Sequence, residues 1–376
     1  MYIYMGHMKF EHTQPYEDWF WRKNKIELVQ GHVTKILPNN NQLELQSGDI
    51  IKYDKLILAL GSKPRPMPID GTQLAGVQSL YSKQDLELME DNTTEVKEAV
   101  VIGGGLIGVE MAEMLHSRGV HVTMVVRENN FWNIVLPEEE SFMVTRHIIS
   151  RGIDLKLGRT VEKIAGKNRV EQVVLDDGSI IPCQFLGITI GVVPNISVLQ
   201  DSGIEVNRGI LVDEYLQTSH KDIYAIGDNA ELRNPPAGRR ALEPVWYAGR
   251  MMGEAVANNI CNKARVYEPG IWFNSAKFFD LEYQTYGTVP NAPQEGLESF
   301  YWEDQKSERA IRLVHNTEKV LVGMNSLGLR LSHEVCEAWI REGKTLDYAL
   351  AHLDQVNFDP ELYRKFEKDV YASKTR

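Results

Sequence analysis

Residues 98–110 read EAVVIGGGLIGVE, and this stretch decides the fold. Glu98–Ile102 is apolar enough for a buried strand, and Gly105–Ser117 carries apolar residues at helical spacing up to a stop at Gly119. A second strand is predicted at His121–Val126. The glycines therefore lie between a strand and a helix N-terminus, where missing side chains let a pyrophosphate approach the backbone N–H groups. A G-x-G-x-x-G sequence alone is a weak signal, but these flanking elements predict dinucleotide binding.

The end of the second strand bears on which dinucleotide would bind. An acid at this place holds the ribose 2′-hydroxyl of NAD, but the strand ends on Val126. Arg127 follows and would meet the 2′-phosphate of NADPH, which favours NADPH. Glu128 could replace the acid if the turn shifts by two residues, and Arg127 is alternatively a solvated loop cation. The expected NAD(P) contacts are Gly103, Gly105, Leu106, Ile107, Gly108, Arg127 and Gly191.

A near-repeat accompanies this loop. Residues 42–64 (QLELQSGDIIKYDKLILALGSKP) and 169–194 (RVEQVVLDDGSIIPCQFLGITIGVVP) each contain a strand, a glycine turn, a second strand and a buried strand ending in Gly-x-x-Pro. The glycine-rich loop precedes only the second copy. The same spacing before Gly61 would place its counterpart ahead of Met1. The sequence thus predicts two nucleotide-binding domains, the first of which lacks its front.

Composition narrows the class of protein. The 376 residues are 43% hydrophobic and 25% charged, which is ordinary for a soluble globular chain of two or three domains. A net charge of −11 argues against nucleic-acid binding. No apolar stretch approaches the length of a membrane span, and no secretory signal opens the chain, so we expect a cytoplasmic protein. The three cysteines, Cys183, Cys261 and Cys336, are too dispersed for a metal site, and no metal is expected.

Further elements follow from the patterns along the chain. A short helix is expected at residues 15–24, a crossover linker at Lys63–Gly76, and an alternation of strands and helices that predicts a parallel sheet from Glu98 to Gly249. From Ile271 the pattern favours a mainly antiparallel sheet followed by helices near Ser332–Glu342, Thr345–His352 and Pro360–Ser373. Strands are also expected at Ile26–Gln30, His32–Ile36, Gln42–Leu45 and Lys55–Leu60.

Four motifs in this order resemble a known family. They are ALGS at residues 59–62, GGGLIGVE at 103–110, GVVPN at 191–195 and IYAIGD at 223–228. Together they resemble the FAD-dependent pyridine nucleotide-disulfide oxidoreductase superfamily, within it most of all the rubredoxin, ferredoxin and nitrite reductase flavoproteins. The resemblance covers the chain to about residue 264 and is looser beyond. It implies an NAD(P)H-dependent reductase with FAD as second cofactor.

The resemblance also implies a division of the α/β chain. Residues 1–90 and 201–265 would form an FAD-binding domain, residues 91–200 an NAD(P)-binding domain, and residues 266–376 a C-terminal α+β domain. Both nucleotide-binding domains would be Rossmann-like, with a three-layer ββα arrangement, and the first domain would be incomplete. The resemblance also implies an electron acceptor that is a redox protein or a small molecule, and a homodimer.

Individual roles are implied in the same way. Glu110 would lie near nicotinamide and flavin and position the nicotinamide; alternatively it is an acid that favours the helix N-terminus. Arg65 would reach the flavin or its phosphates, or is a surface charge. Trp246 would begin a helix at the pyrimidine edge of the flavin, or is a core aromatic. The implied FAD contacts are Val33, Ala59, Gly61, Arg65, Gly227, Asp228 and Trp246.

The missing front of the first domain leaves a second hypothesis open. Without the first glycine loop the ADP half of FAD loses an anchor, so the chain is alternatively a truncated, catalytically weak or inert NAD(P)-binding protein.

Overall fold

The computed structural model describes residues 1–306, 308–358 and 366–374. They divide into two compact units, one made of Tyr2–Arg65 with Val192–Pro269, and the other of Met1, Pro66–Gly191 and Gly270–Arg376. We call these the smaller and the larger unit. The finer division into four segments stays a prediction.

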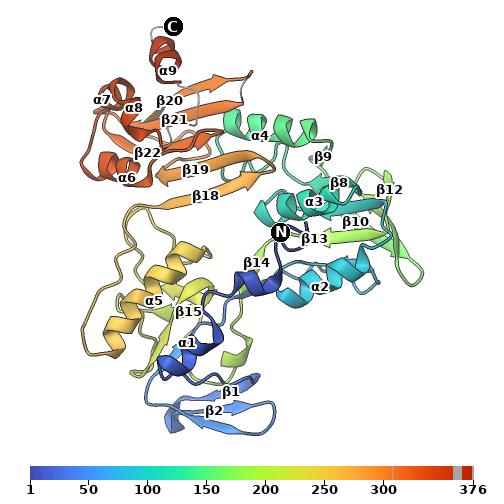
Figure 1. Cartoon of the computed structure of the whole chain (residues 1–376), viewed down its shortest axis with the longest axis vertical. Coiled ribbons are helices and arrows are strands. Elements are labelled where there is room, and N and C mark those ends of the chain that lie inside the picture. The colour runs from blue at the N-terminus through green and yellow to red at the C-terminus, as the bar shows by residue number, and fades with distance from the viewer. Residues whose placement is uncertain (307, 359–365, 375–376) are drawn as a thin grey trace. The chain divides into compact units, whose positions relative to one another are not determined.

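A parallel sheet organises the first part of the larger unit. Its five strands lie in the order β6-β13-β7-β8-β9, and all neighbouring pairs are parallel. Figure 1 labels β13, β8 and β9 of this sheet. The central strand β7 is fully buried from Ala99 to Ile102, as its unbroken apolar run requires for a sheet covered on both faces. The strands are β6 (Val77–Gln78), β13 (Phe185–Ile188), β7 (Glu98–Ile102), β8 (His121–Val126) and β9 (Asp154–Leu157).

Helices and an antiparallel layer accompany this sheet. The Ser82 side chain caps α2 by accepting a hydrogen bond from the backbone N–H of Asp85. The Asp85 carboxylate in turn accepts a hydrogen bond from the backbone N–H of Ser82. The other helices are α3 (Leu106–Ser117) and α4 (Glu138–Ser150), and α2 spans Lys83–Asn92. The antiparallel layer consists of β10 (Val161–Gly166), β11 (Val170–Leu175) and β12 (Ile180–Pro182).

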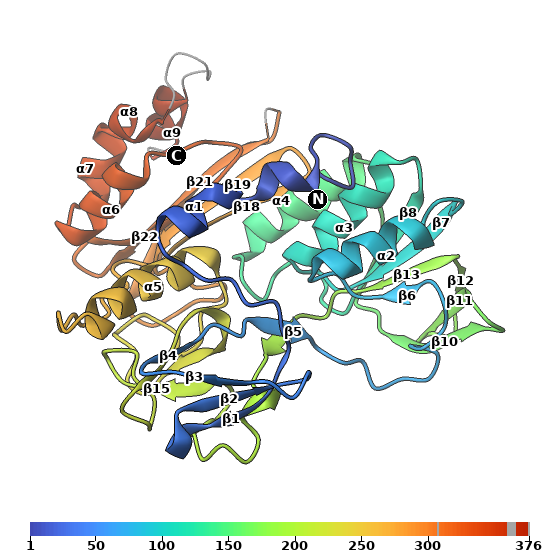
Figure 2. The ribbon, with the colours of Figure 1, turned by 60° about the horizontal axis from the view of Figure 1, so that its bottom comes forward.

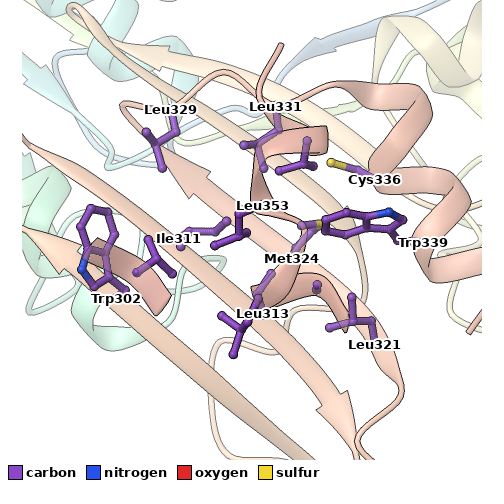
Figure 3. Close-up of a cluster of buried hydrophobic side chains, with 14 of the residues drawn as sticks. Trp302, Ile311, Leu313, Leu321, Met324, Leu329, Leu331, Cys336, Trp339 and Leu353 are labelled. Atoms are coloured by element: carbon purple, nitrogen blue, oxygen red, sulfur yellow. The ribbon is translucent and has the colours of Figure 1, made fainter. Parts of the chain in front are cut away.

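The C-terminal part of the larger unit is a five-stranded antiparallel sheet with helices packed on it. The strand order is β18-β19-β22-β21-β20. Figure 3 shows Trp302, Ile311 and Leu313 of the sheet in one apolar cluster with Trp339 and Leu353 of the helices. The strands are β18 (Phe273–Phe278), β19 (Leu281–Gly287), β20 (Leu297–Asp304), β21 (Arg309–Asn316) and β22 (Leu321–Leu327). The helices are α6 (His333–Arg341), α7 (Leu346–Ala351), α8 (Leu353–Val356) and α9 (Glu367–Ser373).

Polar contacts join α4 to this sheet at both ends of the helix. Near the N-terminus of α4, the Arg312 guanidinium lies 2.7 Å from a Glu139 carboxylate oxygen and 3.2 Å from one of Glu140. Near the C-terminus, the two ring nitrogens of His147 lie 3.0 Å from Asp280 and 3.0 Å from Glu308. Acids in the first turn and a basic group in the last also suit the helix dipole.

The smaller unit holds short sheets around one long helix. The antiparallel strands β1, β2 and β3 follow one another in the blue part of Figure 2. The parallel pair β4–β16 and the parallel pair β15–β17 share an apolar core with α5. Its elements are α1 (Asp18–Lys23), β1 (Val33–Leu37), β2 (Gln42–Leu45), β3 (Ile50–Lys52), β4 (Leu56–Leu58), β5 (Ser62–Pro64), β14 (Val192–Pro194), β15 (Ile210–Val212), β16 (Ile223–Ala225), β17 (Ala230–Leu232) and α5 (Trp246–Ile260).

The expected α/β class with a C-terminal α+β part is confirmed, with two local differences. No strand forms at Ile26–Gln30, so that expectation was wrong. The side chains of Leu28 and Val29 are exposed, and no described strand pairs with this segment. The β-propensity of such residues acts only where a neighbouring strand lets them pack. The helix expected at Pro360–Ser373 falls partly outside the described residues, within which α9 covers its end. In the described ranges, no helix combines the length and apolar character of a membrane span.

Glu140 makes stability depend on pH. Burial raises the pKa of its carboxyl from 4.5 to about 7 against the opposing effect of Arg312. Between these two values the folded state holds a proton that the unfolded chain releases, so the free energy of unfolding should fall as the pH rises from about 4.5 to about 7. The contribution is at most about 3 kcal/mol.

We expect Glu140→Gln to remove this part of the pH dependence, measured by urea unfolding between pH 5 and 7.5. Glu139→Gln is the matched control, because Glu139 contacts the same guanidinium but its side chain is 54% exposed. Equal slopes of stability against pH in the wild type and in Glu140→Gln would contradict the argument.

Candidate functional site

The glycine-rich loop joins β7 to α3 as the sequence predicts. Gly105 is the N-cap of α3 and provides no side-chain cap, so the first-turn N–H groups are left for another acceptor. Leu106 and Ile107 are half-buried in that first turn, and Gly108 is buried. A helix N-terminus at the carboxyl end of a parallel strand is an anion-binding arrangement.

Thr189, just beyond β13, packs against this loop. Its backbone N–H and its hydroxyl both donate to the carbonyl of Ile102, at 2.9 and 2.7 Å. A Cβ at Gly103 would lie 2.5 Å from the Thr189 carbonyl oxygen, and one at Gly108 would lie 2.8 Å from the Thr189 hydroxyl and 2.5 Å from the Gly103 carbonyl. Gly103 also has a φ of +119°, which L side chains rarely adopt. The loop therefore requires glycine at both positions.

The other side of the loop is open. A Cβ at Gly105 would meet nothing within 4 Å, and the same holds at Gly191, which has a φ of +102°. Gly104 instead packs against Val126, because a Cβ added at Gly104 would lie 2.7 Å from the Val126 Cγ1. The open space above Gly105 and the uncapped N–H groups fit the pyrophosphate of a dinucleotide.

The end of β8 carries one exposed cation and one partly covered acid. Val126 is completely buried, so it offers no ligand group. The Arg127 side chain is 73% exposed, and its Nε lies 2.6 Å from a carboxylate oxygen of Glu128. Arg127 and Glu128 thus form an ion pair directly after β8, and their roles toward a dinucleotide stay predictions.

Glu110 lies on α3, one turn into the helix. Desolvation by the surrounding protein raises the pKa of its carboxyl above the ordinary value, although the residue reaches solvent. The N-terminal ammonium opposes this effect and lowers the pKa, whereas the negative charge of Glu113, on the next turn, raises it. A carboxyl perturbed in this way is a functional-site candidate.

A second glycine corner lies in the smaller unit, after β16. Gly227 has a φ of +72° and a Cβ there would meet nothing within 4 Å. Asp228 follows it, and one of its carboxylate oxygens accepts a hydrogen bond from the Ser62 hydroxyl at 3.0 Å. A role of Asp228 toward a cofactor stays a prediction.

Asn229 connects this corner to the chain after β4. It is completely buried; its Nδ2 donates to the Leu58 carbonyl at 3.1 Å, and its Oδ1 accepts from the Gly61 N–H at 3.2 Å. Asn195 adds a backbone hydrogen bond to the Gly61 carbonyl at 2.9 Å. The segment that contains Ala59 and Gly61 is thereby fixed beside Asp228.

Helix α5 begins next to the same corner. A Cβ at Gly249 would lie 3.3 Å from the Gly227 Cα, so the missing side chain lets α5 approach. The N-cap residue Val245 has no side-chain cap, which leaves first-turn N–H groups available. Trp246 is 70% exposed, so the alternative that it is a core aromatic is wrong.

The remaining expected FAD contacts lie in the smaller unit too. Val33 begins β1 and packs against the core of this unit, whereas Ala59 and Arg65 are exposed. Their roles toward a cofactor stay predictions.

Comparison with known proteins agrees with this arrangement. The family model described as pyridine nucleotide-disulphide oxidoreductase matches residues 5–253. The chain belongs to this family.

Relatives in the family carry several activities. The chain is 30% identical to a nitrite reductase [NAD(P)H] of Bacillus subtilis over 84% of its own length and 39% of the relative. It is 32% identical to the rubredoxin-NAD(+) reductase of Ectopseudomonas oleovorans over 64% of its own length and 63% of the relative. A ferredoxin reductase structure from Rhodopseudomonas palustris superposes with a TM-score of 0.79 and 25% identity, covering 87% of this chain and 80% of the other. The chain spans less than two thirds of both curated relatives.

Sequence reasoning missed Thr189 and Asn229. Thr189 lies inside the quoted stretch 169–194, two residues before Gly191, and Asn229 directly follows the motif that ends at Asp228. A polar residue at the end of a buried strand was the available signal, but its partners are distant in sequence.

Alanine variants of the loop glycines test how closely the loop packs on Thr189. We expect Gly108→Ala to destabilise the protein by about 1–3 kcal/mol, because its Cβ would overlap the Gly103 carbonyl and the Thr189 hydroxyl. Gly105→Ala is the matched control and should unfold within about 1 kcal/mol of the wild type, because its Cβ enters open space. Chemical unfolding measures both. Equal stability of the two variants would refute the packing of this loop on Thr189.

Proposed function

We propose that this chain is an NAD(P)H-dependent flavin oxidoreductase that delivers electrons to an acceptor, with FAD as second cofactor. One observation carries the proposal: in a chain of this family, two uncapped helix N-termini, of α3 and α5, each lie beside a glycine that follows a parallel strand. Such corners suit the phosphate and ring oxygens of dinucleotides.

The residues would bind and align rather than react. The Gly103–Gly108 loop would hold the pyrophosphate of NAD(P)H through α3 N–H groups, with Gly191 leaving room nearby. Asp228 would accept hydrogen bonds from the flavin ribityl chain, and the N-terminus of α5 would stabilise negative charge on the reduced ring. When bound, FAD would supply the chemistry by accepting hydride from NAD(P)H and releasing electrons to the acceptor.

Glu110 is proposed to position the nicotinamide. Its raised pKa keeps it protonated to a higher pH than an ordinary glutamate, so a hydrogen-bond donor stays available over a wider range. It would orient the carboxamide and adjust the local charge without forming a covalent bond.

We propose a redox protein as acceptor, because relatives of this chain include a rubredoxin reductase and a ferredoxin reductase subunit. The cysteines give no support to an acceptor thiol in this chain: all three are free, and burial raises the pKa of Cys183 to about 12. Homodimerisation and a cytoplasmic location stay predictions.

Anaerobic titration tests the function. The purified chain is incubated with FAD, freed of excess flavin, and titrated with NADPH and NADH while the flavin absorbance is recorded. We expect bound flavin and bleaching by at least one nucleotide. Nucleotide binding without flavin uptake would favour the alternative of an inert NAD(P)-binding protein, and bound flavin that neither nucleotide bleaches would contradict the proposal.

The proposed contact of Arg127 with the 2′-phosphate is tested by comparing the binding of NADPH and NADH. Because a guanidinium–phosphate hydrogen bond contributes about 1.5–3 kcal/mol, Arg127→Ala should weaken NADPH binding about 10- to 100-fold and leave NADH unchanged. Glu128→Gln should strengthen NADPH binding, since it releases Arg127 from its 2.6 Å ion pair. Arg118→Ala, which removes a cation paired with Glu90 at the other end of α3, is the control. Equal effects of Arg127→Ala on both nucleotides would show that Arg127 does not read the 2′-phosphate.

A further inference from the structure

A buried ion pair lies directly before α5. Arg239 and Glu243 have side chains only 7% and 3% exposed, and they meet through two contacts, of which the Arg239 Nε–Glu243 Oε1 hydrogen bond is 2.7 Å long. The backbone N–H of Arg240 also donates to the Glu243 carboxylate at 3.2 Å. The carboxylate therefore closes a tight loop of five residues just ahead of the helix.

This loop is anchored to the rest of the smaller unit. The Arg239 Nη1 donates to the Pro269 carbonyl at 2.8 Å, and the Ala241 carbonyl accepts from the Leu232 N–H, at the end of β17, at 2.9 Å. The Glu243 carbonyl accepts from the N–H of Val245, the N-cap residue of α5, at 2.8 Å. The pair thus stands between two fixed points and the first residue of the helix.

The pair is largely shielded from bulk solvent. Tyr267 is 5% exposed and its hydroxyl has no hydrogen-bond partner among the described residues. Burial raises the pKa of Tyr267 to about 12, with smaller effects from Arg239 and Glu243. A dry environment makes a charge pair costly to bury, and apolar residues would stabilise the same space as well. Stability alone does not explain the pair, whereas a fixed geometry does.

The helix that the pair precedes approaches the second glycine corner. Besides the close contact of Gly249 with Gly227, the Gly227 N–H lies 3.3 Å from the Met252 sulfur, one turn further along α5. A small change in the direction of α5 would therefore move its N-terminal N–H groups relative to Gly227 and Asp228.

We propose that Arg239 and Glu243 are positioning residues that hold the N-terminus of α5 at the flavin site and thereby set the reduction potential of the bound flavin. This inference rests on the proposed function. The N–H groups of an aligned helix N-terminus stabilise the negative charge of a reduced flavin, and this stabilisation falls off within the first turn. A misaligned helix would therefore make the flavin harder to reduce.

The potential of the FAD-loaded protein tests the proposal, measured by equilibration with a reference dye. We expect Glu243→Gln to lower the equilibrium constant for flavin reduction about tenfold, which is about 30 mV for a two-electron couple. Glu243→Asp, which keeps the carboxylate, should recover part of the shift. The double variant Arg239→Met/Glu243→Leu leaves no buried charge unpaired, so it keeps the protein folded and should show the same shift.

Glu231→Gln is the matched control. Glu231 is also a buried acid of the smaller unit, 4% exposed, and it accepts hydrogen bonds from Asn207 and Gly209 instead of bracing α5. It should lower thermal stability without moving the potential. An unchanged potential in both Glu243→Gln and the double variant, or an equal shift in Glu231→Gln, overturns the proposal.

Hydrogen exchange of the cofactor-free protein separates this inference from the proposed function. If the wild type binds no FAD, the proposed function fails by itself, and the bracing of α5 is decided by the amides of residues 249–252, which are the first in the helix to have backbone acceptors. These should exchange at least about tenfold faster in Glu243→Gln and in the double variant than in the wild type and in Glu231→Gln. Equal rates in all four proteins would show that the pair does not position the helix.

Discussion

The approach of Gly103 and Gly108 to Thr189 is the constraint on which the larger unit depends. Hydrogen bonds from Thr189 to Ile102 align the ends of β13 and β7, and the two glycines let α3 start directly above them. Any side chain at either position would separate the helix from the sheet. This contact places the uncapped N–H groups of α3 over open space, and so it creates the most complete candidate binding site of the chain.

The near-repeat acquires a structural meaning in the smaller unit. The two Gly-x-x-Pro ends pair with each other as the antiparallel strands β5 and β14, with Ser62 opposite Pro194 and Pro64 opposite Val192. The segment that leaves the smaller unit at Arg65 and the segment that re-enters it at Val192 therefore run side by side. The Asn195 N–H donates to the Gly61 carbonyl and the Gly61 N–H donates to Asn229 Oδ1, so both bonds fix Gly61 beside Asp228.

Much of the fold followed from patterns that are local. The strand at Glu98–Ile102, the helix to Ser117 and the C-terminal antiparallel segments were predictable because each carries its own apolar period and its own glycine or capping signal. Ile26–Gln30 has the composition of a strand but no partner strand, and β-propensity depends on such neighbours. Trp246 was ambiguous for a related reason, because exposure at a helix start depends on what the preceding loop packs against.

The sequence by itself determined where glycine must stand, which strands and helices form, and to which family the chain belongs, because these properties reside in contiguous residues. Only the tertiary structure decided which distant polar groups meet. Thr189 under the loop, Asn229 between two strand ends, and the buried pair of Arg239 and Glu243 are held by partners that packing supplies. A hydrogen bond or a buried charge pair is short in range, and no local period in the sequence records it.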